Sequence, residues 1–158
     1  MKLKIERVVK SWEFAEYVIP ASSGYIYNPA GGRRYAPQDT AEHWLKAFAA
    51  FSLVPACVEP KYTNFTGHHF CDGTFIQKHV DIAPDGFVHV RCNLMLQKPK
   101  IGGNPIIDSE EIEIDVGDLW LCLASLESHA SSPIFGGDRM IFSFGGLVRE
   151  HDIQSILA

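Results

Sequence analysis

The sequence lacks the features that mark several classes of protein. None of its four cysteines (Cys57, Cys71, Cys92 and Cys122) forms a Cys-x-x-Cys pair, which argues against a zinc knuckle. No apolar run approaches the roughly 20 residues needed to cross a bilayer. The start of the chain, MKLKIERVVKSWEF, has no apolar stretch of the kind found in secretory signals. We therefore expect a cytoplasmic protein with reduced thiols and no membrane partner.

Positive charge is also scarce. The chain has 14 Lys and Arg against 19 Asp and Glu, a net charge of −5, whereas nucleic-acid-binding proteins usually carry the opposite balance. A nucleic-acid partner is therefore disfavoured. The length of 158 residues suffices for one domain with one core, and we expect residues 1–158 to form a single domain. The sequence leaves the oligomeric state open.

The first 60 residues are expected to form a loop followed by a support helix. Residues 22–39 are rich in Gly, Pro, Ser and Tyr, which is typical of a long loop. Asp39 is a candidate N-cap, with Glu42 as its capping-box partner. The residues that follow place four large apolar side chains on one helical face: Trp44, Leu45, Phe48 and Phe51. Pro55 ends the predicted helix.

From about residue 62 the apolar pattern has the period of a β-strand. Residues 87–96 and 112–116 alternate, and 117–126 is apolar on both faces, as in a buried strand. Residues 139–146 give another strand. Turn signals separate these segments at 83–86, 102–105, 116–118 and 135–138. The pattern predicts a mainly β fold with a flanking helix, and a sandwich or barrel core over 62–147.

Three residues of this β region form a candidate metal site. His79 and Asp81 are two positions apart, so on a strand they point to the same side. One such pair arises by chance in many sequences and also fits a hydrogen bond at a strand end. His129 follows the buried strand, and two His with one Asp can occupy one face of a non-heme Fe(II) while leaving other positions open. Zinc more often takes three His or a set with Cys.

Arg139 adds a cation to this set. If its strand enters the barrel, Arg139, Ile141 and Ser143 share one face. A buried guanidinium without a partner is costly. A dicarboxylate that binds a metal by one end could offer its other carboxylate as that partner. An exposed arginine at a strand start is the competing interpretation.

Four blocks of the sequence carry a resemblance to a known family: DGTFIQKHVD (72–81), RCNLMLQKPKIGG (91–103), GDLWLC (117–122) and HASSPIFGGDR (129–139). They resemble the Fe(II)/2-oxoglutarate-dependent oxygenase superfamily, and more narrowly its prolyl-4-hydroxylase-like branch. The last block is the most specific, because it reproduces the spacing H-x-x-x-P-x-x-x-G-x-R. The resemblance covers roughly residues 70–147. It implies a double-stranded β-helix, a cupin-like jelly roll.

The resemblance also implies an activity and roles for four residues. His79, Asp81 and His129 would bind Fe(II), and Arg139 would bind the distal carboxylate of 2-oxoglutarate. The implied cofactors are Fe(II), 2-oxoglutarate as co-substrate and O₂, with ascorbate as a further candidate. The implied reaction decarboxylates 2-oxoglutarate to succinate and CO₂ and hydroxylates a peptide or protein side chain, or a small molecule.

The sequence departs from the branch at the second co-substrate contact. The branch often has a tyrosine upstream of the H-x-D pair, and this chain has none nearer than Tyr62. Arg91 and Asn93 are the candidates to replace it, although they also fit a solvated strand face. His89, on the same strand, is interpreted as structural or exposed. His68 and His69 are interpreted as loop residues.

Substrate contacts are expected in the N-terminal loop, on the residues Tyr25, Arg33, Arg34 and Tyr35.

Two alternatives to the oxygenase stay open. A cupin-like metalloenzyme that does not use 2-oxoglutarate would keep the metal site but give Arg139 no task. A non-catalytic jelly-roll binding module would need no metal at all.

Overall fold

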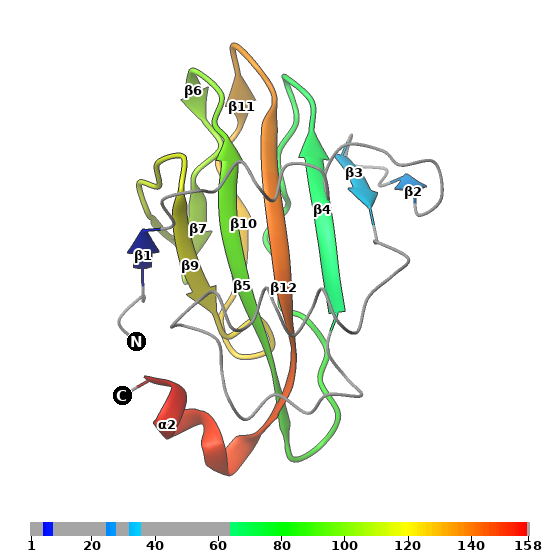
Figure 1. The fold of residues 1–158 in the computed structure, drawn as a ribbon, viewed down its shortest axis with the longest axis vertical. Coiled ribbons are helices and arrows are strands. Elements are labelled where there is room, and N and C mark those ends of the chain that lie inside the picture. The colour runs from blue at the N-terminus through cyan, green and yellow to red at the C-terminus, as the bar shows by residue number, and fades with distance from the viewer. Residues whose placement is uncertain (1–4, 8–24, 28–31, 36–63, 158) are drawn as a thin grey trace.

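The computed structural model describes residues 5–7, 25–27, 32–35 and 64–157, and its largest element is a seven-stranded sheet (Figure 1). All neighbouring strands in this sheet are antiparallel. In sheet order they are β1 (Ile5–Arg7), β9 (Asp118–Cys122), β5 (Phe87–Gln97), β12 (Arg139–Arg149), β4 (Asn64–Phe70), β3 (Gly32–Tyr35) and β2 (Tyr25–Tyr27).

A second, smaller layer lies behind the large sheet in Figure 1. It consists of a three-stranded sheet, β10 (His129–Ser131), β7 (Pro105–Ile107) and β8 (Glu110–Glu111), and a pair, β11 (Ile134–Phe135) with β6 (Ile101–Gly102). The chain passes from β5 in the large sheet through β6, β7 and β8 and returns to it at β9. This architecture confirms the predicted double-stranded β-helix.

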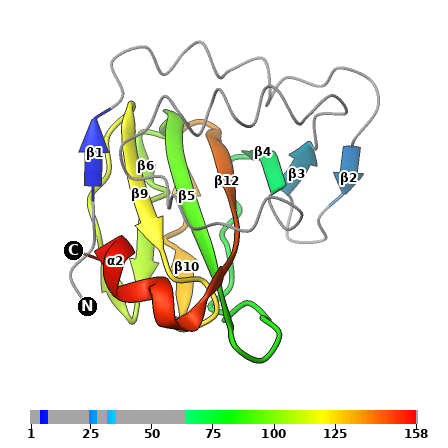
Figure 2. The same ribbon diagram turned by 60° about the horizontal axis from the view of Figure 1, so that its bottom comes forward.

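The long central strands have two buried faces, which explains their apolar composition. On one face of β5, Val88, Val90, Cys92 and Leu94 belong to a core cluster. The short C-terminal elements η3 (Glu150–Asp152) and α2 (Ile153–Leu157) follow β12 (Figure 2). Ile153 packs into this cluster.

The opposite face of the large sheet looks toward the smaller layer. A second core cluster forms there from Met95, Ile107, Ile114, Trp120, Cys122, Ala124 and Ile141. Because both layers contribute to this cluster, it lies between them. The remaining space between the layers is the pocket described below.

The turn at Gly102–Gly103 requires glycine. Gly102 has φ +73°, and a Cβ there would lie 1.7 Å from the carbonyl oxygen of Pro133. Pairing of Gly102 with Ile134 in the β6–β11 ladder brings the two segments this close. The predicted turn is therefore confirmed, and it packs directly on the block that runs from His129 to Arg139.

Some predicted elements differ from the structure. Residues 112–116 do not continue as a strand beyond β8, although Ile114 is fully buried. Its backbone N–H donates to the side-chain oxygen of Asn104 at 3.4 Å, in place of a ladder partner.

The predictions for the first 70 residues are partly wrong and partly untested. The predicted loop 22–39 contains the strands β2 and β3, and β1 joins the large sheet beside β9. His68 and His69 lie in β4, paired with β12 and β3, and not in a loop. The predicted support helix falls outside the described residues. None of the helices in the described part of the chain is long and apolar enough to span a membrane.

Candidate metal centre and adjoining pocket

His79, Asp81 and His129 come together because two chain segments pair along their backbones. The backbone N–H of His79 donates to the carbonyl of His129 at 3.0 Å, and that of His129 donates to the carbonyl of His79 at 2.8 Å. Asp81 continues the pairing by donating its N–H to the carbonyl of Ala124 at 2.8 Å. The predicted triad is therefore assembled by backbone hydrogen bonds between segments far apart in the sequence.

Both imidazole rings are held in one orientation by the carbonyl two residues before them. His79 Nδ1 lies 2.7 Å from the carbonyl oxygen of Gln77, and His129 Nδ1 lies 3.0 Å from that of Glu127. A carbonyl only accepts hydrogen bonds, so each Nδ1 carries a proton, and in the neutral imidazole each Nε2 presents a lone pair. This arrangement is common around metal-ligating histidines.

The three presented atoms converge on one point. Asp81 Oδ1 lies 3.5 Å from His79 Nε2 and 3.7 Å from His129 Nε2, and all three ligand atoms lie within 4.8 Å of one another. Bonds of about 2.1 Å at right angles would place neighbouring ligand atoms about 3 Å apart. The triad therefore fits a metal ion once its ligand atoms move closer together, and its two nitrogens and one carboxylate are the donor set of non-heme Fe(II) sites.

The electrostatic environment keeps Asp81 ionised. A hydrogen bond from His89 and the nearby imidazoles of His129 and His79 lower the pKa of the Asp81 carboxyl below its ordinary value, against partial burial that raises it. A carboxylate in this state can bind a cation without first losing a proton.

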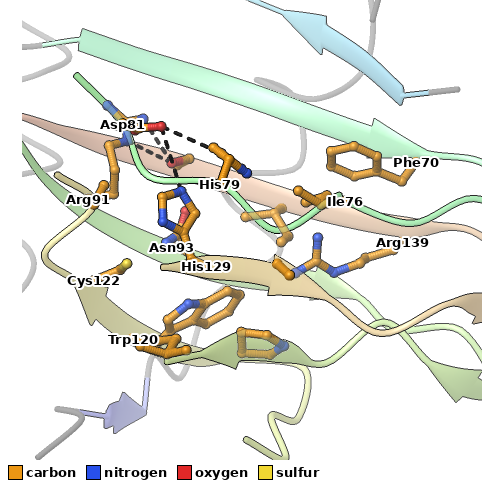
Figure 3. A pocket seen from close by; sticks show the side chains of 16 residues that line it. Phe70, Ile76, His79, Asp81, Arg91, Asn93, Trp120, Cys122, His129 and Arg139 are labelled. Carbon is orange, nitrogen blue, oxygen red and sulfur yellow. Dashed lines mark hydrogen bonds and ion pairs between the residues drawn. The ribbon is translucent and has the colours of Figure 1, made fainter. Parts of the chain in front are cut away.

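A cavity of about 270 Å³ opens from the triad into the space between the two layers. Figure 3 shows the triad toward one end of this pocket and Arg139 toward the other. The residues that line it come from both layers: Phe70, Ile76, His79, Asp81, Arg91, Asn93, Pro105, Ile107, Trp120, Cys122, Ala124, His129, Ala130, Arg139, Ile141 and Ser143.

Arg139 is a buried cation without a counter-charge in the described part of the chain. Its side chain is 2% exposed, and its Nε and Nη1 atoms have no hydrogen-bond partner among the described residues. The guanidinium lies 5.7 Å from the centre of the Phe70 ring. Burial lowers its pKa to about 9, so the side chain still carries its charge near neutral pH. As predicted, Ile141 and Ser143 line the same pocket.

Arg91 and Asn93 also line the pocket, as the alternation of their strand predicted. Arg91 donates from Nε and Nη2 to Ser143 Oγ, at 3.1 and 2.8 Å. The solvated strand face considered for these two residues is therefore wrong for Arg91, which is 9% exposed.

The other predicted contacts, Tyr25, Arg33, Arg34 and Tyr35, lie on β2 and β3 at the edge of the large sheet, where Gly32 is in register with Phe70.

Sequence reasoning missed one residue of the site. His89, interpreted as structural or exposed, places Nδ1 3.0 Å from Asp81 Oδ2. The sequence feature that could have pointed to His89 as a site residue was its position on the same strand face as Arg91 and Asn93. Pairing of the segment around Asp81 with Ala124, which brings it beside His89, is a long-range contact that the local pattern does not contain.

Comparison with known proteins supports the fold. No protein-family model matches the sequence, and no curated protein matches it by sequence. Solved structures do match. A prolyl-4-hydroxylase from Pseudomonas putida has a TM-score of 0.66 at 16% identity, covering 94% of this chain and 92% of that one. A prolyl hydroxylase from Trichoplax adhaerens, in complex with a peptide fragment of the hypoxia inducible factor oxygen degradation domain, has a TM-score of 0.67 at 14% identity, covering 97% and 86%.

A third match is the viral collagen prolyl hydroxylase of Paramecium bursaria Chlorella virus-1, in its 2-oxoglutarate complex. Its TM-score is 0.63 at 13% identity, with 95% of this chain and 97% of that chain covered. The chain therefore resembles prolyl-4-hydroxylases in structure, as its motifs predicted. At these identities the resemblance establishes a shared fold.

Proposed function

We propose that this protein is an Fe(II)- and 2-oxoglutarate-dependent oxygenase. The observation that carries the proposal is the buried guanidinium of Arg139, whose Nε and Nη1 have no hydrogen-bond partner among the described residues and which lies in the same pocket as the His79–Asp81–His129 triad. Burying a charge without a partner costs several kcal/mol, so a fold retains such a group where a ligand supplies the counter-charge. A dicarboxylate can meet the metal with one end and Arg139 with the other.

The residues of the pocket have distinct tasks in this proposal. His79, Asp81 and His129 hold Fe(II), which when bound supplies the redox chemistry that joins 2-oxoglutarate decarboxylation to hydroxylation. Arg139 pairs with the distal carboxylate of 2-oxoglutarate and fixes its direction. Arg91 and Asn93 offer further polar contacts along the co-substrate. Phe70, Trp120 and Ile141 exclude water, because each is buried and lines the cavity.

The substrate is proposed to be a peptide or protein side chain, or a small molecule. The overall reaction consumes 2-oxoglutarate, O₂ and a substrate C–H bond and yields succinate, CO₂ and the hydroxylated product. A peptide substrate is supported by the likeness to the Trichoplax adhaerens prolyl hydroxylase, which was solved with a peptide bound. The β2–β3 edge is the place where we expect substrate contacts.

The first experiment is an anaerobic titration of the metal-free protein, with Fe(II) and then 2-oxoglutarate. We expect a weak visible charge-transfer band only when both are present, because the co-substrate must chelate the metal to produce it. Admission of O₂ should then form succinate. His79→Ala should remove metal binding and the band. His151→Ala is the matched control, since His151 is 75% exposed and contacts only Asp152 among the ion pairs described.

Two results would contradict the proposal in different ways. Metal bound by the triad without any band on adding 2-oxoglutarate would favour a cupin-like metalloenzyme that does not use this co-substrate. No metal bound at all would favour a non-catalytic jelly-roll module.

A further inference from the structure

The two carboxylate oxygens of Asp81 have different partners. Oδ1 faces the Nε2 atoms of His79 and His129, at 3.5 and 3.7 Å. Oδ2 faces away from them toward His89 Nδ1, at 3.0 Å. A carboxylate can bind a metal through one oxygen or through both. The contact with His89 therefore bears on how many coordination positions Asp81 would occupy.

The proton in this contact lies on His89. Ionised Asp81 only accepts hydrogen bonds, so His89 Nδ1 must be the donor. His89 Nε2 is buried and has no hydrogen-bond partner among the described residues. A proton on Nε2 would be a buried donor left unpaired, which is more costly than an unpaired lone pair in the same place. Burial thus favours the tautomer that donates to Asp81.

The position of His89 relative to Asp81 is set by two consecutive residues. Ser125 Oγ accepts the backbone N–H of His89 at 2.8 Å, and the N–H of Ser125 donates to the carbonyl of His89 at 3.4 Å. The carbonyl of Ala124 accepts the N–H of Asp81 at 2.8 Å. On β5 itself, Val88 and Val90 are buried on the opposite face, at 1% and 0% exposure. These contacts hold the imidazole and the carboxylate against each other from both sides.

We propose that His89 is a positioning residue that holds Asp81 Oδ2 and so restricts Asp81 to metal binding through Oδ1 alone. The coordination positions that a two-oxygen carboxylate would block then stay open for the co-substrate and O₂. This inference rests on the metal site of the proposed function, and it adds a residue that no motif of the family resemblance assigns here. His89 acts through Asp81 and does not touch the metal.

Two near-isosteric variants of His89 distinguish the positioning of Asp81 by a hydrogen bond from a purely steric effect of the side-chain volume. In His89→Asn the side-chain NH₂ takes the place of Nδ1 and can still donate to Asp81 Oδ2. In His89→Gln the NH₂ takes the place of Nε2 and points away from it. Metal affinity is measured anaerobically with Fe(II) or Co(II), and the 2-oxoglutarate concentration that half-saturates the charge-transfer band is measured at saturating Fe(II).

We expect His89→Gln to weaken metal binding by about 10–100-fold, the range typical of lost outer partners of metal ligands. At saturating metal it should also need more 2-oxoglutarate, because Asp81 is then free to use both oxygens. His89→Asn should stay within about threefold of the wild type in both measurements, as expected when the hydrogen bond is retained. Thermal unfolding of the metal-free variants checks that both fold. If His89→Gln does not fold, Ser125→Ala replaces it, and a loss in the same direction is expected.

Equal metal affinity and equal 2-oxoglutarate demand in His89→Gln and the wild type would overturn the role of His89 while leaving the proposed function intact. Equal losses in His89→Asn and His89→Gln would also overturn it, since they would indicate a purely steric role. A wild-type protein that binds no metal would instead overturn the proposed function, so the two failures are distinguishable.

Discussion

Two donors of Arg91 converge on the single hydroxyl of Ser143, from neighbouring strands of the large sheet. Both residues line the pocket, so this pair fixes the guanidinium on the pocket wall. Removing the hydroxyl takes away the acceptor that these two donors share, and a hydrogen bond to a charged group contributes about 1.5–3 kcal/mol.

Ser143→Ala is therefore expected to lower the free energy of unfolding by up to this amount and to raise the half-saturating concentration of 2-oxoglutarate. Metal affinity should not change, because neither residue belongs to the triad. Chemical denaturation and the anaerobic titration measure the two effects. Ser143→Thr keeps the oxygen and is the matched control. An unchanged 2-oxoglutarate response in Ser143→Ala would remove Arg91 from the co-substrate site.

We expect Arg139→Met to be more stable than the wild type but unable to bind 2-oxoglutarate. It removes a buried charge that has no counter-charge in the described part of the ligand-free chain, so we expect the variant to unfold at a higher denaturant concentration. Replacing buried charges by apolar groups of similar volume gains about 1–4 kcal/mol in favourable cases. 2-Oxoglutarate binding should be lost while metal binding remains.

The control for this variant is Arg149→Met at the other end of the same strand, where the arginine is exposed and its guanidinium lies 5.2 Å from the centre of the Phe87 ring. It should change neither stability nor co-substrate binding by much. Retention of 2-oxoglutarate affinity in Arg139→Met would argue for the cupin-like alternative.

Gly145→Ala tests the close contact of the two central strands. A Cβ at Gly145 would lie 2.0 Å from the carbonyl oxygen of Val90, which is backbone and cannot rotate away. The strands β12 and β5 must therefore separate locally, and such overpacking costs about 1–3 kcal/mol or more. A drop in melting temperature of several degrees is expected for a chain of this size.

Gly86→Ala is the comparison for that measurement. Gly86 has φ +82° and open space around its Cβ position, so only the backbone strain of about 1–2 kcal/mol applies. A melting temperature of Gly145→Ala at or above that of Gly86→Ala would contradict the close approach of β12 to β5.

The cysteines should differ in reactivity toward an alkylating reagent. Burial, followed by the nearby charges of Glu127 and Asp81, raises the pKa of the Cys122 thiol far above its ordinary value, and Cys92 is fully buried. Thiolate is the reactive form, so both should resist labelling in the folded protein. Cys71 is half-buried and should be labelled first among the three cysteines that the structure describes. Peptide mass spectrometry after timed labelling measures this order, and rapid labelling of Cys122 would mean that β9 is accessible.

Much of the β core and most of the candidate site could be predicted from local patterns. The alternation in β5 placed Arg91 and Asn93 on one face, which follows from strand periodicity. The roles of His129 and Arg139 were implied by the resemblance of the block 129–139 to an oxygenase family, and the turn within this block follows from its glycines.

The remainder depends on long-range pairing. No local sequence feature distinguishes His89 from other strand residues, because its contact with Asp81 depends on the position of a segment that no local pattern specifies. The strands β1, β2 and β3 are too short to show an alternating apolar pattern in the sequence. They form by pairing at the edges of the large sheet, where β1 pairs with β9 and β3 pairs with β4. Residues 112–116 have the right period, but the backbone N–H of Ile114 donates to the side-chain oxygen of Asn104 in place of a ladder partner, while its side chain is buried in the core.

The reciprocal backbone hydrogen bonds between His79 and His129 mean that a metal bound by these residues would also affect folding. An ion bound there would tie together two segments that the sequence separates by about a third of the chain, and the unfolded chain holds no such preformed site. Folding and metal loading are then thermodynamically linked: the protein gains stability in proportion to the logarithm of free metal over its dissociation constant. If the metal is the Fe(II) of the proposed function, the lifetime of the polypeptide in a cell would follow the supply of iron, and scarcity of iron would reduce the amount of protein as well as its activity.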